Sequence, residues 1–182
     1  MTEKVLKRFV RTGIPKRTEL ITERGKVAIE NIQTTDRILT EEKSFIPVKK
    51  VRKNSTKGYY LISSHGLGNI PLTKETKVCV RDVELKTENG QVVPIISWPY
   101  WISVQNLNPS KHMVLSPHNP HTINPHQAIV SRDVKAASSY MDKDQQAWIQ
   151  INKVEYCDDT VDVFYIELGK DSGVAVEYLS IK

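Results

Sequence analysis

The sequence contains few cysteines and no long hydrophobic run, and each shortage excludes a class of protein. Cys79 and Cys157 are the only cysteines in 182 residues, which is too few for a disulfide scaffold and gives no metal-binding spacing. No apolar run approaches the roughly 20 residues that a membrane-spanning helix needs, so we expect no membrane contact. Residues 1–12 lack the continuous apolar core of a secretory signal. These absences favour a reducing compartment and two free thiols.

The motifs of common enzymes are missing as well. The sequence has no phosphate-binding loop, no hydrolase nucleophile elbow and no dinucleotide fingerprint. We therefore expect no cofactor, no small-molecule substrate and no ordinary metabolic reaction. With 39% hydrophobic and 26% charged residues, the composition is that of an ordinary globular domain with one core.

Positive charge is concentrated in the first third of the chain. Residues 1–57 hold 15 Lys and Arg against 7 Asp and Glu, although the net charge of the whole chain is only +5. The cations of the N-terminal basic arm, residues 1–12, are Lys4, Lys7, Arg8 and Arg11. Such an arm suits an acidic protein surface or nucleic acid. No nucleic-acid-binding motif accompanies it, so we favour the protein surface.

Most of the chain has the pattern of short strands joined by turns. Strands are expected at 19–22, 27–29, 37–39, 45–51, 59–63, 77–83, 91–96, 148–154, 161–168 and 174–181. The one helix candidate is 132–142, and a turn is expected at 88–90. This pattern predicts an all-β fold with at most one short helix.

Residues 116–126 form a loop rich in proline and histidine. Its prolines exclude a helix and interrupt any central strand. His118, His121 and His126 are weak candidates for a metal site, because no cysteine or acidic ligand is interleaved with them. The alternatives are a polar surface loop or a stiff contact arm, and we expect no bound metal.

Four separated pieces of the sequence carry a family resemblance. They lie within residues 13–39, 70–80, 101–115 and 148–168. In this order and at this spacing, they resemble the Hint domain, the self-cleaving module of inteins and Hedgehog proteins. The resemblance covers roughly residues 13–182 and implies that they form a single domain, a horseshoe of bent β-hairpins. No homing-endonuclease domain is inserted after the third piece, because the span before Trp148 is too short for one.

The resemblance also implies where catalytic groups belong, and this chain departs from the pattern there. Gly13 stands where the family has its cysteine nucleophile. Thr73 matches a threonine that acts with a histidine three residues later, but Thr76 occupies the histidine's place. Tyr165 stands where a central aspartate often appears, and Lys182 ends the chain where the family has a His-Asn pair. We expect these positions to be degenerate.

The chemistry of these replacements predicts a protein that is not an enzyme. Glycine has no side chain to attack a carbonyl, and threonine does not exchange a proton near neutral pH as histidine does. The alternative is a self-processing Hint enzyme with a displaced nucleophile, for which Thr12, Cys79 and Cys157 are the candidates. A further alternative is a nucleic-acid-binding regulator that uses the basic first third.

The favoured function is a structural or adaptor protein that contacts other proteins within a larger assembly. The family resemblance suggests a bacteriophage virion or tail-assembly component, located in the host cytoplasm or the virion. The expected partner-binding residues are the basic arm and the aromatic cluster Trp98, Tyr100 and Trp101, because aromatic side chains are frequent interface anchors. The alternative is that these aromatics belong to the core.

Overall fold

The computed structural model describes residues 13–64, 69–116, 139–141, 147–169, 174–176 and 179–181. These residues form curled antiparallel sheets, so the predicted all-β fold is confirmed. The strands are β1 (Ile14–Pro15), β2 (Glu19–Thr22), β3 (Gly25–Ala28), β4 (Arg37–Leu39), β5 (Phe45–Ser63), β6 (Ile70–Thr73), β7 (Lys77–Glu88), β8 (Gln91–Ile96), β9 (Tyr100–Ser103), β10 (His112–Ser116), β11 (Ser139–Met141), β12 (Ala147–Gln150), β13 (Lys153–Leu168), β14 (Val174–Val176) and β15 (Leu179–Ile181). Two 3₁₀ turns accompany them, η1 (Ile29–Asn31) and η2 (Val104–Asn106).

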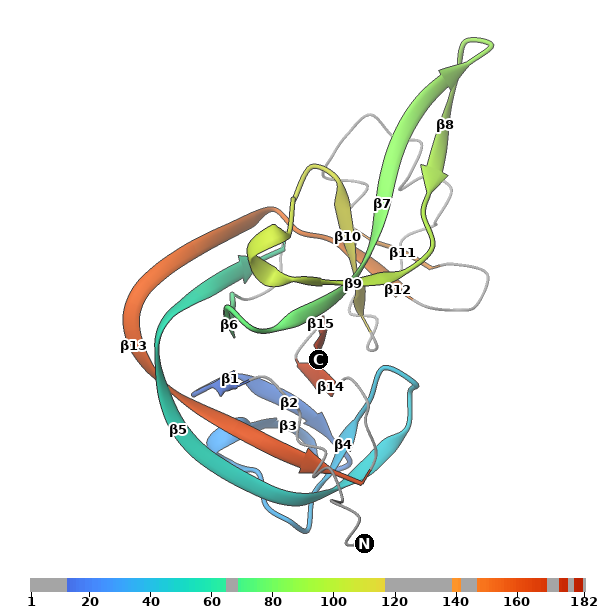
Figure 1. The fold of residues 1–182 in the computed structure, drawn as a ribbon. Helices are drawn as coiled ribbons and strands as arrows, with labels where there is room; N and C mark the ends of the chain where they lie inside the picture. The colour runs from blue at the N-terminus through green and yellow to red at the C-terminus, as the bar shows by residue number, and fades with distance from the viewer. Residues whose placement is uncertain are drawn as a thin grey trace, which may run out of the picture.

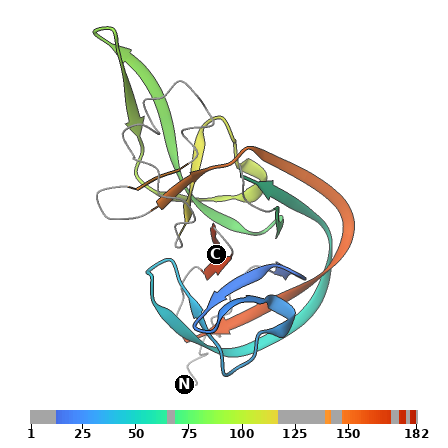
Figure 2. The ribbon, with the colours of Figure 1, turned by 180° about the vertical axis from the view of Figure 1, so that it is seen from behind.

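The long pair β5–β13 gives the molecule its horseshoe shape. The two strands stay paired from Ser63 and Lys153 to Val48 and Leu168, and they sweep around one side of the molecule (Figures 1 and 2). The sequence predicted two separate strands in each of these segments. They are continuous because Gly58, at φ 81°, and an irregularity between Cys157 and Thr160 let the pair bend without breaking.

The first hairpin is held by one buried carboxylate. Strands β2 and β3 meet at a turn in which Gly25 has a φ of 99°, a conformation that glycine adopts without a steric cost. The guanidinium of Arg24 bonds both oxygens of Asp36 at 2.7 and 3.0 Å, and the Gln33 amide donates to the same carboxylate at 2.8 Å. These bonds tie the turn to the segment before β4, and they hold the pKa of Asp36 below its ordinary value.

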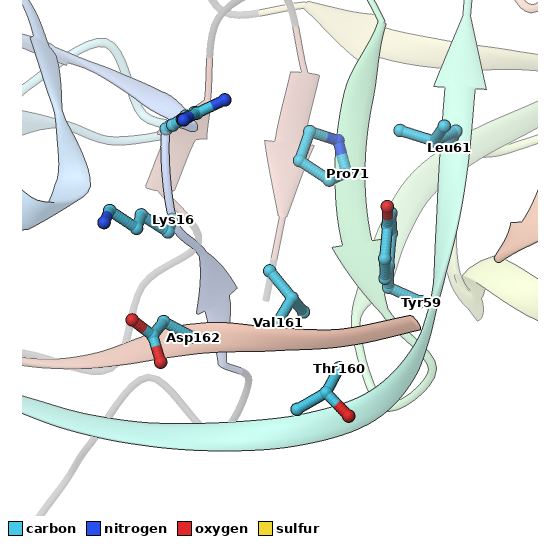
Figure 3. Close-up of a pocket in the computed structure, with 8 residues that line it drawn as sticks. Lys16, Tyr59, Leu61, Pro71, Thr160, Val161 and Asp162 are labelled. Atoms are coloured by element: carbon cyan, nitrogen blue, oxygen red, sulfur yellow. The ribbon is translucent and has the colours of Figure 1, made fainter. Parts of the chain in front are cut away.

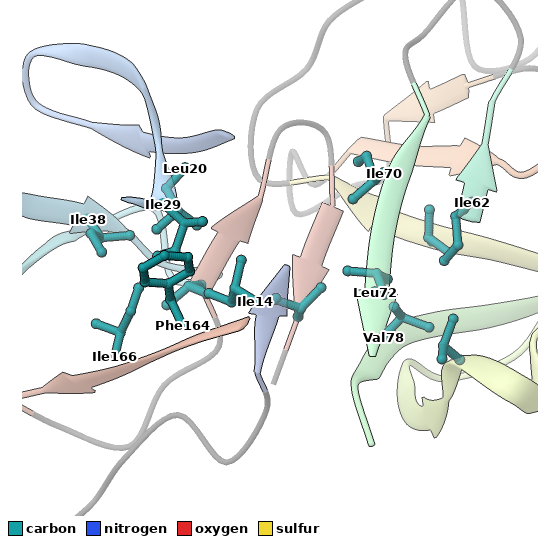
Figure 4. Close-up of a cluster of buried hydrophobic side chains, with 14 of the residues drawn as sticks. Ile14, Leu20, Ile29, Ile38, Ile62, Ile70, Leu72, Val78, Phe164 and Ile166 are labelled. Atoms are coloured by element: carbon teal, nitrogen blue, oxygen red, sulfur yellow. The ribbon is translucent and has the colours of Figure 1, made fainter. Parts of the chain in front are cut away.

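One hydrophobic core joins the two ends of the horseshoe. Ile14 on β1 lies between Leu20 and Phe164 on one side and Leu72 and Val78 on the other (Figure 4). Ile14 is completely buried, and burial of such a side chain stabilises the fold by about 1.5–3 kcal/mol. A second, smaller cluster lies under β7, β10 and β12 and consists of Cys79, Met113, Leu115 and Trp148.

The helix expected at 132–142 is wrong over its last part. Residues 139–141 form β11, which pairs with β12 from Ser139↔Ile149 to Met141↔Ala147. Alanine-rich composition favoured a helix, but pairing to a buried neighbouring strand decides the structure here. The turn at 88–90 is confirmed, with positive φ at Asn89 and Gly90, as a tight hairpin requires. No helix among the described residues is long and apolar enough to cross a membrane.

Candidate functional site

Gly13 lies directly before β1, which pairs with β13. Ile14 and Pro15 pair with Phe164 and Val163, and Gly13 itself is buried. A Cβ atom placed on Gly13 would lie 3.0 Å from the Cβ of Val163 and 3.1 Å from its Cγ2. The same atom would lie 3.2 Å from Cζ of the Tyr165 ring. Carbon atoms prefer separations of about 3.5–4.0 Å, so a side chain at position 13 requires Val163 and Tyr165 to move by a few tenths of an ångström.

Thr73 and Thr76 are brought together, as the resemblance implied. Thr73 ends β6 and Thr76 precedes β7, and the Thr76 amide donates to the Thr73 carbonyl at 3.0 Å. Their Oγ1 atoms are 3.1 Å apart, and both residues are almost fully buried. The Thr76 carbonyl accepts a hydrogen bond from the Val104 amide at 2.9 Å, which fixes this turn to η2. Two hydroxyls can polarise a carbonyl, but they do not supply an acid or base near neutral pH.

The two cysteines differ in environment, and both are free thiols. Cys79 is buried in the second cluster, and burial raises the pKa of its thiol to about 12. A thiol of that pKa is almost entirely protonated at neutral pH and is a poor nucleophile. Cys157 is half-buried on β13 opposite Tyr59. This environment of Cys79 argues against its use as a displaced nucleophile.

One polar cluster was not foreseen from the sequence. His112 on β10 is buried, and its Nδ1 accepts a hydrogen bond from the Asn108 amide at 3.0 Å. Its Nε2 lies 3.4 Å from Oδ1 of Asp82, which in turn accepts a hydrogen bond from the Tyr100 hydroxyl at 2.5 Å. Lys111 completes the cluster with an ion pair of 3.0 Å to Asp82.

The cluster has the character of a structural link between β7, β9 and β10. Desolvation lowers the pKa of His112 despite the neighbouring Asp82 charge. Because Nδ1 accepts the Asn108 amide, the neutral ring carries its proton on Nε2. Burial acts to raise the pKa of Asp82, but hydrogen bonds from Tyr100 and Lys111 outweigh it and the pKa is lowered. Its members are distant in sequence, so no spacing motif could have identified them.

Of the three aromatic residues expected to contact a partner, two are exposed and one packs against the hydrophobic core. Trp98 is 84% exposed, and Tyr100 is 36% exposed with its hydroxyl bonded to Asp82. Trp101 pairs with Cys79 and packs against the second hydrophobic cluster. The segment that carries Trp98 is fixed, because Ser97 exchanges hydrogen bonds of 2.9 and 3.0 Å with the backbone of Asp82.

Several predicted site residues fall outside the described residues. They are Lys4, Lys7, Arg8, Arg11, Thr12, His118, His121, His126 and Lys182, together with positions 117–126 of the Pro/His-rich loop. Within the described ranges, no three His, Cys, Asp or Glu side chains gather as a metal site requires.

Comparison with known proteins agrees with this geometry at the level of the fold. Neither a protein-family model nor a curated protein sequence matches the chain. Among solved structures, the chain is similar to a bacterial intein-like domain from Clostridium thermocellum, with a TM-score of 0.55 and 16% identity over 93% of this chain and 96% of that one.

Two further solved structures show the same likeness. A DnaB intein from Synechocystis sp. PCC 6803 aligns with a TM-score of 0.58 and 11% identity, over 93% of this chain and 96% of that one. The gp41-1 intein aligns with a TM-score of 0.53 and 15% identity, over 92% of this chain and 95% of that one. With the bent β5–β13 pair and the buried threonine turn, these matches establish that the chain has the intein-like Hint fold.

Proposed function

We propose that this Hint-fold domain does not cleave itself and serves as a contact module for partner proteins in a larger assembly. The observation that carries the proposal is the crowding of Gly13 by Val163 and Tyr165. Self-cleavage of this kind begins when a side-chain thiol or hydroxyl attacks the preceding carbonyl. Here that side chain is missing, and two residues of β13 approach position 13 closely.

The neighbouring groups support the same proposal. A general base or acid near the peptide must exchange a proton in the working pH range. Thr76 is a hydroxyl residue bonded to Thr73, so the turn has no titrating group at this position. The buried thiol of Cys79, with a pKa of about 12, is not a substitute nucleophile. The described groups around Gly13 therefore offer neither the nucleophile nor the proton-exchanging partner of the first step.

The projecting hairpin β7–β8 is the proposed contact surface, and we assign it to a partner protein. The hairpin extends well beyond the body of the molecule (Figure 1). It exposes Leu85 at 54% and Ile95 at 40%, and Trp98 follows at its base with 84% exposed. A large exposed tryptophan on a fixed backbone is the type of residue that anchors protein interfaces.

The likeness to inteins favours one alternative, a self-processing domain with displaced catalytic groups. The mass of the purified chain separates the two functions. We expect a single species of 20.8 kDa after long incubation, with or without a thiol reagent. Loss of residues 1–12, or any other defined fragment that appears without added protease, would support self-processing and contradict the proposal.

A further inference from the structure

A groove of about 540 Å³ lies beside the first turn of the chain, and the candidate catalytic positions do not use it. Its lining comes from the turn after β1 and from β5, β6 and β13 (Figure 3). Neither Val163 nor Tyr165, which crowd Gly13, is part of it. The volume falls within the range of about 300–1,000 Å³ that is typical of ligand pockets. The groove is therefore large enough for a few residues of a peptide.

One side of the groove is apolar. Tyr59 and Leu61 are two positions apart on β5, so they share a face of the strand, and Leu61 faces Pro71 across the β5–β6 pair. Figure 3 shows these three side chains on one side, with Val161 of β13 between them and Lys16. All four apolar-wall residues are half-buried, so part of each is in contact with solvent. This wall suits aliphatic groups.

The other side of the groove carries an excess of positive charge. Lys16 and Arg17 are both exposed, and neither makes an ion pair with another residue in the described ranges. The nearby carboxylate of Asp162 is already bonded to Lys53 at 2.7 Å. Lys16 also acts on the charge of Asp162, and Glu30 accepts the Arg17 amide. The three cations Lys16, Arg17 and Lys53 still outnumber these two carboxylates, which favours an anionic ligand.

Arg17 has an unusual backbone conformation. Its φ is 69°, in the left-handed region that favours glycine. The turn is held in this form by the Lys16 amide, which donates to the Asp162 carbonyl at 2.8 Å, and by the Arg17 amide, which donates to Glu30 at 2.9 Å. These two bonds hold Arg17, whose exposed side chain lines the groove, at a fixed place on the rim.

We propose that this groove binds a short peptide segment that presents a carboxylate beside an apolar side chain. Arg17 and Lys16 would bond the carboxylate, because guanidinium and carboxylate form strong paired hydrogen bonds. The apolar wall would take the neighbouring side chain. The mainly aliphatic wall suits a peptide side chain better than it suits the bases of a nucleic-acid strand.

The test measures fluorescence anisotropy of labelled pentapeptides against the full chain at low salt. The probe has blocked ends and one aspartate between two leucines. A matched peptide carries asparagine instead, and a third carries asparagine with a free terminal carboxylate. We expect the asparagine peptide with blocked ends to bind about tenfold more weakly than the aspartate probe. Comparison of the two carboxylate peptides identifies whether an acidic side chain or a chain end is the better ligand.

Arg17→Gly tests the residue that carries the inference. This change relaxes the backbone, so we expect an unchanged or higher Tm together with at least about tenfold weaker binding of the aspartate probe. Lys43→Gly is the matched control: Lys43 also has a positive φ, 57°, and it does not line the groove. This control should retain full probe binding. Lys16→Ala should weaken binding, whereas Lys26→Ala, an exposed lysine on β3, should not.

The proposal is overturned if the aspartate and asparagine peptides bind alike, or if Arg17→Gly binds as the wild type does. It is also overturned if only a single-stranded oligonucleotide binds and Arg17→Gly abolishes that binding. The inference extends the protein-contact role proposed above, but the two fail on different evidence. A protein that keeps its full mass but binds none of the peptides contradicts only the proposal that the groove binds a peptide. A chain that cleaves itself contradicts the proposed function.

Discussion

Replacement of Gly13 by alanine is the substitution that examines the crowded position most closely. The added Cβ would lie 3.0–3.2 Å from atoms of Val163 and Tyr165, and the completely buried Val163 has little room to retreat. Overpacking of this kind costs about 1–3 kcal/mol. For a domain of this size each kcal/mol lowers Tm by about 2–4 °C, so we expect a decrease of roughly 2–12 °C.

Calorimetry and urea unfolding of the wild type and four variants measure this effect. Gly169→Ala is the control, because a Cβ there meets Ile46 and Lys49 at ordinary distances of 3.8 and 3.9 Å. Its unfolding free energy should stay within about 0.5 kcal/mol of wild type. Val163→Ala alone should destabilise by roughly 1–3 kcal/mol through lost burial.

The double variant Gly13→Ala with Val163→Ala completes the cycle. Removal of Cγ2 eliminates one of the close contacts. The double variant should therefore lose less unfolding free energy than the two single variants lose together, by at least about 0.5 kcal/mol. If Gly13→Ala is as stable as wild type, the position is not filled and this part of the account fails. If the free-energy losses of the two single variants simply add in the double variant, the strain of Gly13→Ala does not come from its contact with Val163.

Three further predictions concern the fold around the site. Asp36→Asn should lower the free energy of unfolding by about 1–3 kcal/mol at pH 7, because Arg24 loses a paired carboxylate. The folded pKa of Asp36 lies below its unfolded value, so this stabilisation is complete above about pH 4 and disappears as pH falls through the folded pKa. The difference in unfolding free energy between wild type and variant, measured by urea unfolding, should shrink over the same pH range. A difference that does not change with pH would refute the ion pair. Cys79, with a pKa of about 12, should resist iodoacetamide at pH 8 until the chain is unfolded, as followed by peptide mass mapping; rapid alkylation of the folded protein at this residue would contradict its burial. Gly58→Ala should lower Tm, because φ is 81° and the new methyl group would meet the Tyr156 hydroxyl; an unchanged Tm would show that the bend does not depend on glycine.

The sequence predicted the elements whose signals are local. The Asn89–Gly90 turn, the alternation in β7 and the apolar runs of β2 and β13 each carry their pattern within a few residues. The long bent strands were predicted in pieces, because nothing local indicates that Gly58 continues a strand through a bend instead of ending it. The segment 139–141 was misassigned because its strand partner, β12, lies beyond the local window.

The candidate site was predictable only as a set of residue types. Gly13 lacks a nucleophile by its identity, but the crowding by Val163 and Tyr165 depends on a strand about 150 positions later in the chain. Such register cannot be derived from one hydrophobic pattern. The His112–Asp82–Tyr100 cluster and the groove beside Arg17 also assemble from distant segments, so they appeared only in the folded structure.

Intact mass spectrometry of the wild type and of Gly13→Cys, each incubated with and without dithiothreitol, tests the central claim most directly. We expect both proteins to keep their full mass, 20.8 kDa for the wild type, because a thiol at position 13 would still lack a proton-exchanging partner at Thr76. Release of residues 1–12 from the wild type would contradict the account outright. Thiol-dependent cleavage of Gly13→Cys alone would show that the machinery around position 13 is intact and that only the nucleophile has been lost.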